Sequence, residues 1–455
     1  MSWGQGFNRR SFIKGAGLTA VAGASGIAEA VNVDAALIPE PARGKYDFDE
    51  VYDRVGTDCY KWDKQINIFG GENIVVPMGI ADMDFRTAPV VTNALLKRIG
   101  HENWGYIDVP PSYKESIISW NKRRYGVEIE PDQILNANGV NPAILSILRA
   151  FSPRGSKVIV QAPAYASFYY TIEDAGCVVA ENHLRQVDGR YEMDFDHLES
   201  IIDHDTNALI LCNPQNPTGN CWSREDLTTL GEICTRRRVV VIADEIHCDF
   251  VNKGQKYVPY ETLDDEAVVR NSITTKSTSK SFNLAATKCA YMHSRNADYL
   301  ARIKATGHND AVNTLGIVAS EAAYNEAEDW LDQLVPYIDG NMDFAEKYIN
   351  EKIRHINWVK PEGTYLAWLD VSELAERIGA AEMAAEYNRN RGPDEIEKSP
   401  EHMVEKYLVE NAGVQLNDGY RYGHGGAGHM RMNLATSRKL VAKALDNIAS
   451  ATRKA

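Results

Sequence analysis

Short apolar runs alternate with helical stretches through the middle of the chain. The apolar runs are four or five residues long, which is the length of a buried strand. They lie at 157–160, 208–212, 239–243 and 272–275, and helical stretches such as 224–236 separate them. Because such runs are typical of parallel strands covered on both faces, the pattern predicts an α/β fold with a mostly parallel sheet sandwiched by helices.

Helical patterns also precede this region. Residues 92–99 and 111–125 are predicted helices, and Asn141-Pro142-Ala143 opens another. Proline near the first turn of a helix is favourable there, because its missing N–H has no intrahelical partner to bind.

The pattern changes to long helices after Gly316, with the clearest at 317–324 and 329–353. Residues 358–369 are predicted to form two strands around a Pro-Glu-Gly turn. The polar segment 380–400 has the composition of an insertion or a flexible loop.

A chain of 455 residues is long for a single core, which predicts a large domain and a smaller one. We expect a large domain at 86–330 and a smaller α+β domain at 331–455, which part of an N-terminal arm at 31–85 joins. Residues 1–30 are set apart as a signal segment.

That signal segment resembles a twin-arginine export signal. Arg9 and Arg10 precede a weakly apolar, Gly/Ala-rich run at 15–28, and Ala28-Glu29-Ala30 resembles a cleavage site. The run is too short and Gly-rich for a stable transmembrane helix. Export through this route is therefore expected; the alternative is a tail that happens to contain two arginines, on a cytoplasmic protein.

Composition narrows the classes of partner. With 44% hydrophobic and 25% charged residues the chain has ordinary globular composition, and its net charge of −14 would repel nucleic acid and anionic membranes. Small molecules are the expected partners. The seven cysteines contain no CxxC pair, and an odd number cannot form a complete set of intrachain disulfides, which favours folding in a reducing compartment.

Four side chains with distinct chemistry follow the ends of the predicted strands. Tyr165, Asn213, Asp244 and Lys280 come after the four apolar runs in turn. In parallel α/β sheets ligands bind at the carboxyl ends of the strands, so these side chains are expected to converge. Each alone has an ordinary alternative: core packing for the tyrosine, a turn for the asparagine, a helix N-cap for the aspartate and a solvated charge for the lysine.

Pyridoxal phosphate (PLP) catalysis requires this combination. A lysine forms a Schiff base with the cofactor aldehyde, and a carboxylate keeps the pyridine nitrogen protonated. An amide steadies the ring oxygen, an aromatic ring stacks on the pyridine, and hydroxyls with helix N-terminal amides hold the phosphate.

The chain resembles the fold-type I PLP enzymes of the class I/II aminotransferase superfamily, in particular the cystathionine β-lyase (C–S lyase) branch with the maltose-regulon modulator type. The resemblance covers most of residues 46–440. Nine short motifs occur in the order found in that superfamily: Pro77–Phe85, Trp104–Tyr106, Ala162–Tyr165, Cys212–Gly219, Ala243–His247, Ser277–Asn283, Pro361–Tyr365, Leu416–Gly419 and Gly425–Asn433.

The resemblance implies roles for residues around the cofactor ring. Lys280 matches the Schiff-base lysine and Asp244 the partner of the pyridine nitrogen. Tyr165 matches the stacking ring and Asn213 the amide near the ring oxygen, with His247 where many relatives have a tyrosine. No metal ligand is implied.

Residues for the phosphate are implied in the same way. Gly139 and Val140 match the phosphate-binding turn, and Ser277 and Ser279 are further donors. Lys288 lies eight residues after the Schiff-base lysine, where many aminotransferases carry a phosphate-binding arginine, so it is either a phosphate ligand or a lysine at the edge of the sheet.

Substrate and partner residues complete the expected site. Arg431 matches the arginine that binds the substrate α-carboxylate, with the backbone near Ala81 beside it. Tyr106 matches a tyrosine that reaches the neighbouring subunit's cofactor in relatives, which implies a homodimer. Lys276 falls outside the motifs and is expected to be solvated or structural.

The implied reaction starts when the substrate amine displaces Lys280, which then removes the Cα proton. Loss of the β-substituent from cystathionine or another L-cysteine S-conjugate would give a thiol, pyruvate and ammonia. An aminotransferase would share the early steps and is the first alternative. A regulatory protein with a PLP fold is the second, although the chain has no helix-turn-helix extension.

Overall fold

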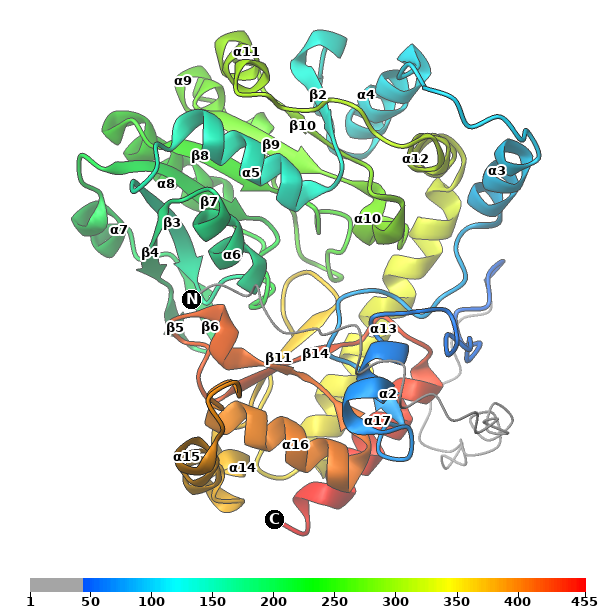
Figure 1. Ribbon diagram of the computed structural model, residues 1–455, viewed down its shortest axis with the longest axis vertical. Helices are drawn as coiled ribbons and strands as arrows, with labels where there is room; N and C mark the ends of the chain where they lie inside the picture. The colour runs from blue at the N-terminus through cyan, green and yellow to red at the C-terminus, as the bar shows by residue number, and fades with distance from the viewer. Residues whose placement is uncertain (1–43) are drawn as a thin grey trace.

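A seven-stranded sheet forms the upper part of the molecule in Figure 1. The computed structural model describes residues 44–455, so the predicted leader at 1–30 lies outside the described residues. The strands run in the order β2-β10-β9-β8-β7-β3-β4. Their bounds are β2 Ile134–Ala137, β3 Lys157–Ala162, β4 Val178–His183, β7 Thr206–Cys212, β8 Val240–Asp244, β9 Ser272–Lys276 and β10 Ala290–His293.

The five strands from β9 to β4 are parallel, and only β10 runs antiparallel to its neighbours β9 and β2. Side chains along each central strand alternate between two cores. Ile210 of β7 belongs to one hydrophobic cluster, and its neighbours Leu209 and Leu211 belong to another. Both faces of the sheet are thus buried, which explains the continuous apolar runs in the sequence.

Helices cover both faces of this sheet and confirm the predicted layering (Figure 1). One face packs against α5 (Val140–Phe151), α6 (Ala166–Asp174) and α11 (Ala297–Ala305). The opposite face packs against α7 (Phe195–Ile201), α8 (Arg224–Arg237) and α9 (Glu266–Arg270). A two-stranded hairpin, β5 (Arg185–Val187) with β6 (Arg190–Glu192), extends from β4.

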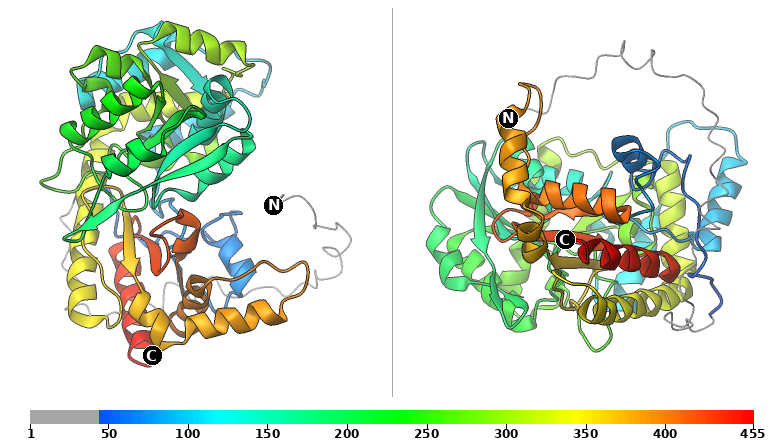
Figure 2. Two further views of the ribbon diagram at one scale, coloured as in Figure 1. Left: turned by 90° about the vertical axis from the view of Figure 1, so that its left-hand side faces the viewer. Right: turned by 90° about the horizontal axis from the view of Figure 1, so that it is seen from below.

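The lower part of the molecule is built around a smaller antiparallel sheet, in the order β11-β14-β13. Its strands are β11 Leu366–Asp370, β13 Asn417–Asp418 and β14 His429–Asn433. The helices of this part are α2 Asp63–Phe69, α14 Ser372–Arg377, α15 Ala380–Asn390, α16 Pro400–Ala412 and α17 Arg438–Thr452. Figure 2 shows α16 and α17 side by side when the molecule is seen from below.

Several helices connect or flank the two parts. The long helix α13 (Glu328–Lys352) runs from the upper part into the lower one (Figure 2). The others are α3 Pro89–Ile99, α4 Pro111–Tyr125, α10 Thr278–Ser281 and α12 Thr314–Glu326. The N-terminal arm is fastened to the lower part by strand β1 (Val76–Pro77), which pairs in parallel with β12 (Val414–Gln415). The exact domain boundaries stay a prediction.

Two predicted elements were wrong. Residues 358–369 do not form two strands, since only Leu366–Asp370 is a strand. The preceding turn binds loops of the upper part instead: Gly363 N–H donates to Gly219 O and Thr364 N–H to Phe250 O. These bonds replace the hydrogen bonds expected between two paired strands.

The segment 380–400 is not a loop throughout, because α15 occupies Ala380–Asn390. Ala380 and Ala384 are buried in the lower core, and the remaining positions of the helix are mostly polar and exposed. Polarity concealed a helix whose buried face consists of small alanines, which are strong helix formers. Helix α3 also begins three residues earlier than predicted, with Pro89 in its first turn.

No helix among residues 44–455 has both the length and the apolar composition that a membrane crossing would require.

Asn341 of α13 links that helix to the C-terminal segments through buried hydrogen bonds. It is fully buried, and its Nδ2 donates to Leu434 O at 2.9 Å and to Thr436 O at 2.8 Å. Its Oδ1 accepts from Arg438 Nε at 2.9 Å. One side chain therefore satisfies three buried groups that flank β14 and α17.

The substitution Asn341→Leu keeps the branching of the side chain and its number of heavy atoms but leaves those groups without partners. We expect the free energy of unfolding to fall by roughly 2–4 kcal/mol, measured by urea denaturation. Asn411→Leu, on the exposed face of α16, is the matched control and should change stability by less than about 0.5 kcal/mol. Equal effects of the two substitutions would contradict this account of Asn341.

Candidate active site

Four neighbouring parallel strands deliver the predicted residues to one edge of the large sheet. Asp244 is the last residue of β8, Asn213 directly follows β7, and Tyr165 lies three residues after β3. Lys280 is on the short helix α10, which follows β9. Asn213 N–H donates to Asp244 O at 2.9 Å, so these two strand ends are fixed to each other. The four strand ends therefore lie at one edge of the sheet, where the sequence predicted them.

The Lys280 amine points away from the sheet toward the N-terminal arm. Its Nζ donates to Ala81 O at 2.7 Å, and the same carbonyl accepts from Tyr365 Oη at 3.0 Å. Burial, and after it the positive charge of Arg431, lower the pKa of Lys280 to about 8, against the opposing effect of the carboxylates Asp82 and Asp244. An amine with this pKa is neutral in a substantial fraction of molecules near neutral pH, as a nucleophile or base requires.

Asp244 is a buried acid in weakly polar surroundings. Its Oδ1 accepts from Ile246 N at 3.1 Å, and only 4% of the residue is exposed. Burial raises the pKa of Asp244 to about 7, although that hydrogen bond and the charge of Lys280 act in the opposite direction. A cationic ring nitrogen beside this carboxylate would compensate the cost of burying its charge.

His247 and Arg431 lie beside the lysine, and each has a buried nitrogen without a hydrogen-bond partner among residues 44–455. For His247 this atom is Nδ1, and for Arg431 it is Nε. Burial, followed by the charges of Lys280 and Arg431, holds the pKa of His247 well below its usual range, so the ring is neutral. Polar atoms left in this state indicate that the site is built for a ligand.

The remaining groups of Arg431 are held in place by the fold. Its Nη1 donates to Asn216 Oδ1 at 3.1 Å and its Nη2 to Gly79 O at 2.9 Å, while the guanidinium lies 5.5 Å from the centre of the Tyr422 ring. A guanidinium fixed in one orientation is suited to bind a carboxylate through two parallel hydrogen bonds.

The side chain of Asn213 already makes two hydrogen bonds within the protein, which its predicted role did not include. Its Nδ2 donates to Val258 O at 2.9 Å, and its Oδ1 accepts from Trp222 N at 3.3 Å. A side-chain amide has two N–H groups, so one remains for a ring oxygen. Tyr165 is half-buried and packs edge-on against Phe168, with ring centres 5.6 Å apart.

The predicted phosphate turn stands at the N-terminus of α5. Gly139 is the N-cap residue and has a φ of +128°, a backbone conformation that favours glycine. Val140 is the first helical residue, and Pro142 falls within the first turn, where N–H groups have no intrahelical partner. The proline has no N–H to offer, but the amides of the two preceding helical residues are available to an anion.

The two serines differ in how far they are already engaged. Ser277 caps α10: its Oγ accepts from Ser279 N at 3.0 Å and donates to Cys289 O at 2.7 Å. The Oγ of Ser279 lies 2.7 Å from the Oγ of Ser277 and is half-exposed. Because Ser277 uses its only proton on Cys289 O, Ser279 is the hydroxyl that could turn its proton from Ser277 to a phosphate.

Two predicted residues lie apart from this cluster. Lys288 is exposed in the turn that precedes β10, where its φ is +50°. Tyr106 is fully exposed in the segment that joins α3 to α4. Among residues 44–455 no contact brings either side chain to Lys280, and both roles stay predictions.

A buried network behind the site escaped the sequence analysis. Lys276 is only 4% exposed, donates to Asn121 Oδ1 at 3.1 Å, and lies 3.9 Å from both Glu245 Oε2 and the centre of the Tyr125 ring. Glu245 also accepts from Tyr257 Oη at 2.5 Å. Lys276 is therefore structural rather than solvated. The only sign of this role in the sequence was the position of Lys276 at the end of an apolar strand.

A second network ties Asp249 to the same region. The Asp249 carboxylate accepts hydrogen bonds from the hydroxyls of Ser281 and Tyr125. Ser281 is the neighbour of Lys280, just as Glu245 is the neighbour of Asp244. Ser281 and Glu245, the neighbours of the two site residues, are thus both held by buried polar contacts.

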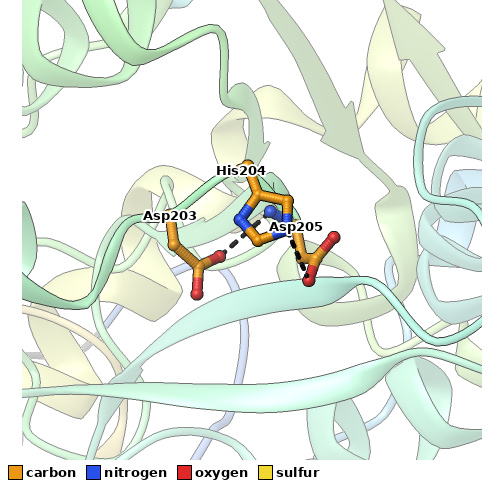
Figure 3. Close-up of side chains that lie close together, drawn as sticks. All are labelled: Asp203, His204 and Asp205. Carbon is orange, nitrogen blue, oxygen red and sulfur yellow. Dashed lines mark hydrogen bonds and ion pairs between the residues drawn. The ribbon is translucent and has the colours of Figure 1, made fainter.

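One group of possible metal ligands is found within the described part of the chain. Figure 3 shows Asp203, His204 and Asp205, all exposed, in the turn before β7. Asp203 already contacts Lys157 and accepts from Asp205 N at 3.0 Å. These bonds are those of an ordinary acidic turn, far along the strand from the site.

The residues present fit PLP. An acid for the ring nitrogen, a neutral histidine with a free nitrogen, a free amide N–H, a half-buried tyrosine and a helix N-terminus surround a lysine with a lowered pKa. When bound there, the cofactor supplies an aldehyde and an electron-withdrawing ring.

Chemical modification of the cofactor-free protein tests the pKa of Lys280. The rate of amine acylation, followed by peptide mass spectrometry, should rise about tenfold per pH unit up to about pH 8 and then level off, because only the neutral amine reacts. Free N-acetyl-lysine in the same tube is the reference and should continue to rise to about pH 10. Identical profiles for the two amines would refute the lowered pKa.

Comparison with known proteins extends these observations. Residues 73–448 match the family described as aminotransferase class I and II. Cystathionine beta-lyase PatB of Bacillus subtilis (strain 168) is 34% identical over 409 residues, which cover 89% of this chain and 99% of that protein. Protein MalY of Escherichia coli (strain K12) is 31% identical over 418 residues, covering 90% and 99%.

A solved structure agrees with them. The crystal structure of the PLP-bound C-S lyase from Staphylococcus hominis superimposes with a TM-score of 0.79 at 30% sequence identity. The match covers 90% of this chain and 98% of that chain. The similarity therefore includes both the upper and the lower part of the molecule.

Proposed function

Because the chain belongs to the class I and II aminotransferase family, we propose that it is a PLP-dependent C–S β-lyase. Its proposed substrates are cystathionine or related L-cysteine S-conjugates, and the products are a thiol, pyruvate and ammonia. One observation carries the proposal: Lys280 and Arg431 both bind carbonyls of the short segment Gly79–Ala81, so an amine and a guanidinium face one small space.

Arg431 would bind the substrate α-carboxylate and thereby orient the Cα–H bond toward Lys280. Fixing the substrate in this way removes rotational freedom before the proton moves. His247 stays neutral beside it, so it adds no second positive charge to the carboxylate site. Asp244 would hold the ring nitrogen in its charged form.

Lys280 would act as the base that takes the proton from Cα. Its pKa of about 8 is close to the operating pH, which keeps enough of the amine neutral while leaving it basic enough to accept a proton. The same amine, once protonated, can deliver the proton to the departing sulfur. One residue thus serves both proton transfers.

The early steps are the same for a lyase and an aminotransferase. The outcomes differ in whether the β-substituent leaves or a proton returns to the cofactor. The names of the relatives, cystathionine beta-lyase PatB and the Staphylococcus hominis C-S lyase, support elimination.

We also infer a homodimer in which Tyr106 reaches the partner's cofactor. Support comes from the segment between α3 and α4, where Trp104, Tyr106 and Ile107 are large, apolar and exposed together. Such a patch is typical of a surface that another chain covers.

The direct assay is pyruvate release from L-cystathionine in the absence of any 2-oxo acid. The full chain with PLP should form pyruvate continuously, and Lys280→Ala should lower the rate by about 10²–10⁴-fold because the proton acceptor is lost. Lys304→Ala, an exposed lysine of α11, is the matched control and should retain the wild-type rate. Product formation only after a 2-oxo acid is added would favour transamination instead.

A further inference from the structure

The Ala81 carbonyl beside the site lysine accepts two hydrogen bonds at once. Lys280 Nζ donates to it at 2.7 Å and Tyr365 Oη at 3.0 Å. A carbonyl oxygen has two lone pairs, so it can accept from both donors. Lys280 comes from the upper part of the molecule, on α10, and Tyr365 lies directly before β11 of the lower part. One oxygen therefore joins the site amine to the smaller sheet.

The peptide groups on both sides of this carbonyl are fixed by one buried side chain. Asn433, the last residue of β14, donates through Nδ2 to Ile80 O at 2.7 Å and to Asp82 O at 2.6 Å. Asn433 itself is fully buried. Because Asn433 occupies the carbonyls on either side, the carbonyl of Ala81 is the one that is left to the lysine.

The Tyr365 side chain is held in place by residues of the upper part. It is fully buried, and its ring packs edge-on against Phe250 and His247, with ring centres 4.8 Å and 5.6 Å apart. Its backbone carbonyl accepts from Leu434 N at 2.9 Å. Among residues 44–455, the bond to Ala81 O is the one hydrogen bond that its hydroxyl makes. The hydroxyl therefore stays on this carbonyl when the lysine moves.

The two donors differ in how firmly they keep their protons. Burial, and after it the charge of Asp82, raise the pKa of Tyr365 well above its usual range, against the opposing charge of Arg431. The amine of Lys280, in contrast, exchanges between its charged and neutral forms near neutral pH. The charged and titratable groups that face this amine are Arg431, Asp82, Asp244 and His247. The Ala81 carbonyl thus has one permanent donor and one that can leave.

We propose that Tyr365 is a positioning residue for Lys280, because its hydroxyl keeps the Ala81 carbonyl paired while the lysine amine moves to the substrate. An acceptor that is left without any donor costs far more than the exchange of one hydrogen bond for another. With Tyr365 in place, the amine can leave without that cost. The inference rests on the proposed lyase function, in which Lys280 takes a proton from the substrate, and adds to it a residue that acts only through Ala81.

Sharing of the carbonyl also weakens its hold on the charged amine. An oxygen that already accepts from a phenol is a poorer acceptor for a second donor, and a hydrogen bond to an ammonium favours the charged form. In Tyr365→Phe the lysine has this carbonyl to itself. The pKa of Lys280 should then rise above its wild-type value of about 8.

Amine acylation of the cofactor-free protein measures this shift. The midpoint of the pH profile of Lys280, followed by peptide mass spectrometry, should rise by roughly 0.5–1 pH unit in Tyr365→Phe. Tyr407→Phe is the matched control, because Tyr407 Oη also donates to a backbone carbonyl of the lower part, Ala451 O at 2.9 Å. This control should leave the midpoint of Lys280 unchanged. The same midpoint in all three proteins would overturn the inference.

A double-mutant cycle measures whether the two donors share one acceptor. In the wild-type background Tyr365→Phe leaves Lys280 on the Ala81 carbonyl, whereas in the Lys280→Ala background it leaves no donor. The substitution should therefore raise the equilibrium constant for unfolding in urea roughly three- to tenfold more in the Lys280→Ala background. A structural role through packing on Phe250 costs the same in both backgrounds, and that result would overturn the inference.

Neither measurement depends on the lyase reaction. If wild-type protein with PLP releases no pyruvate from L-cystathionine but both effects occur, the proposed function fails and the coupling of Tyr365 to Lys280 stands. If pyruvate is released and either effect is missing, the proposed function stands and the role of Tyr365 fails.

Discussion

The site depends on one stretch of backbone, Gly79–Asp84, to which the two halves of the molecule bind. Arg431, from the smaller sheet, holds Gly79 O, and Lys280, from the large sheet, holds Ala81 O. Asn283, three residues after the lysine, accepts from Met83 N at 2.9 Å and donates to Met83 O at 2.8 Å. This segment therefore fixes the positions of the amine and the guanidinium relative to each other.

Buried charge holds the segment, and buried charge also makes the site reactive. Asp84, at the end of the segment, pairs with Lys61 at 2.6 Å and with Arg54 at 2.9 Å, and these partners hold the pKa of its carboxyl below the usual range despite burial. Asp244 is buried and Lys280 is half-buried, both without such close partners, and their pKa values are shifted toward neutrality. The fold thus stabilises its structural charges and leaves its functional ones ready for a ligand.

Local signals in the sequence were sufficient for the parallel sheet and for the residues at its edge. Apolar runs locate the strands, and strand ends locate Asp244 and Lys280, because both depend only on neighbouring residues and on a general rule of α/β folds. The buried role of Lys276 and the helix α15 could not be predicted in this way. The partners of Lys276 come from distant elements, and the buried face of α15 consists of alanines, which give no clear apolar pattern.

The most direct test of the central claim is to identify the lysine that holds the cofactor. Holoenzyme reduced with borohydride, digested and analysed by peptide mass spectrometry should carry the phosphopyridoxyl group on Lys280 alone. A label on Lys276 or Lys288, or on no lysine at all, would contradict the account.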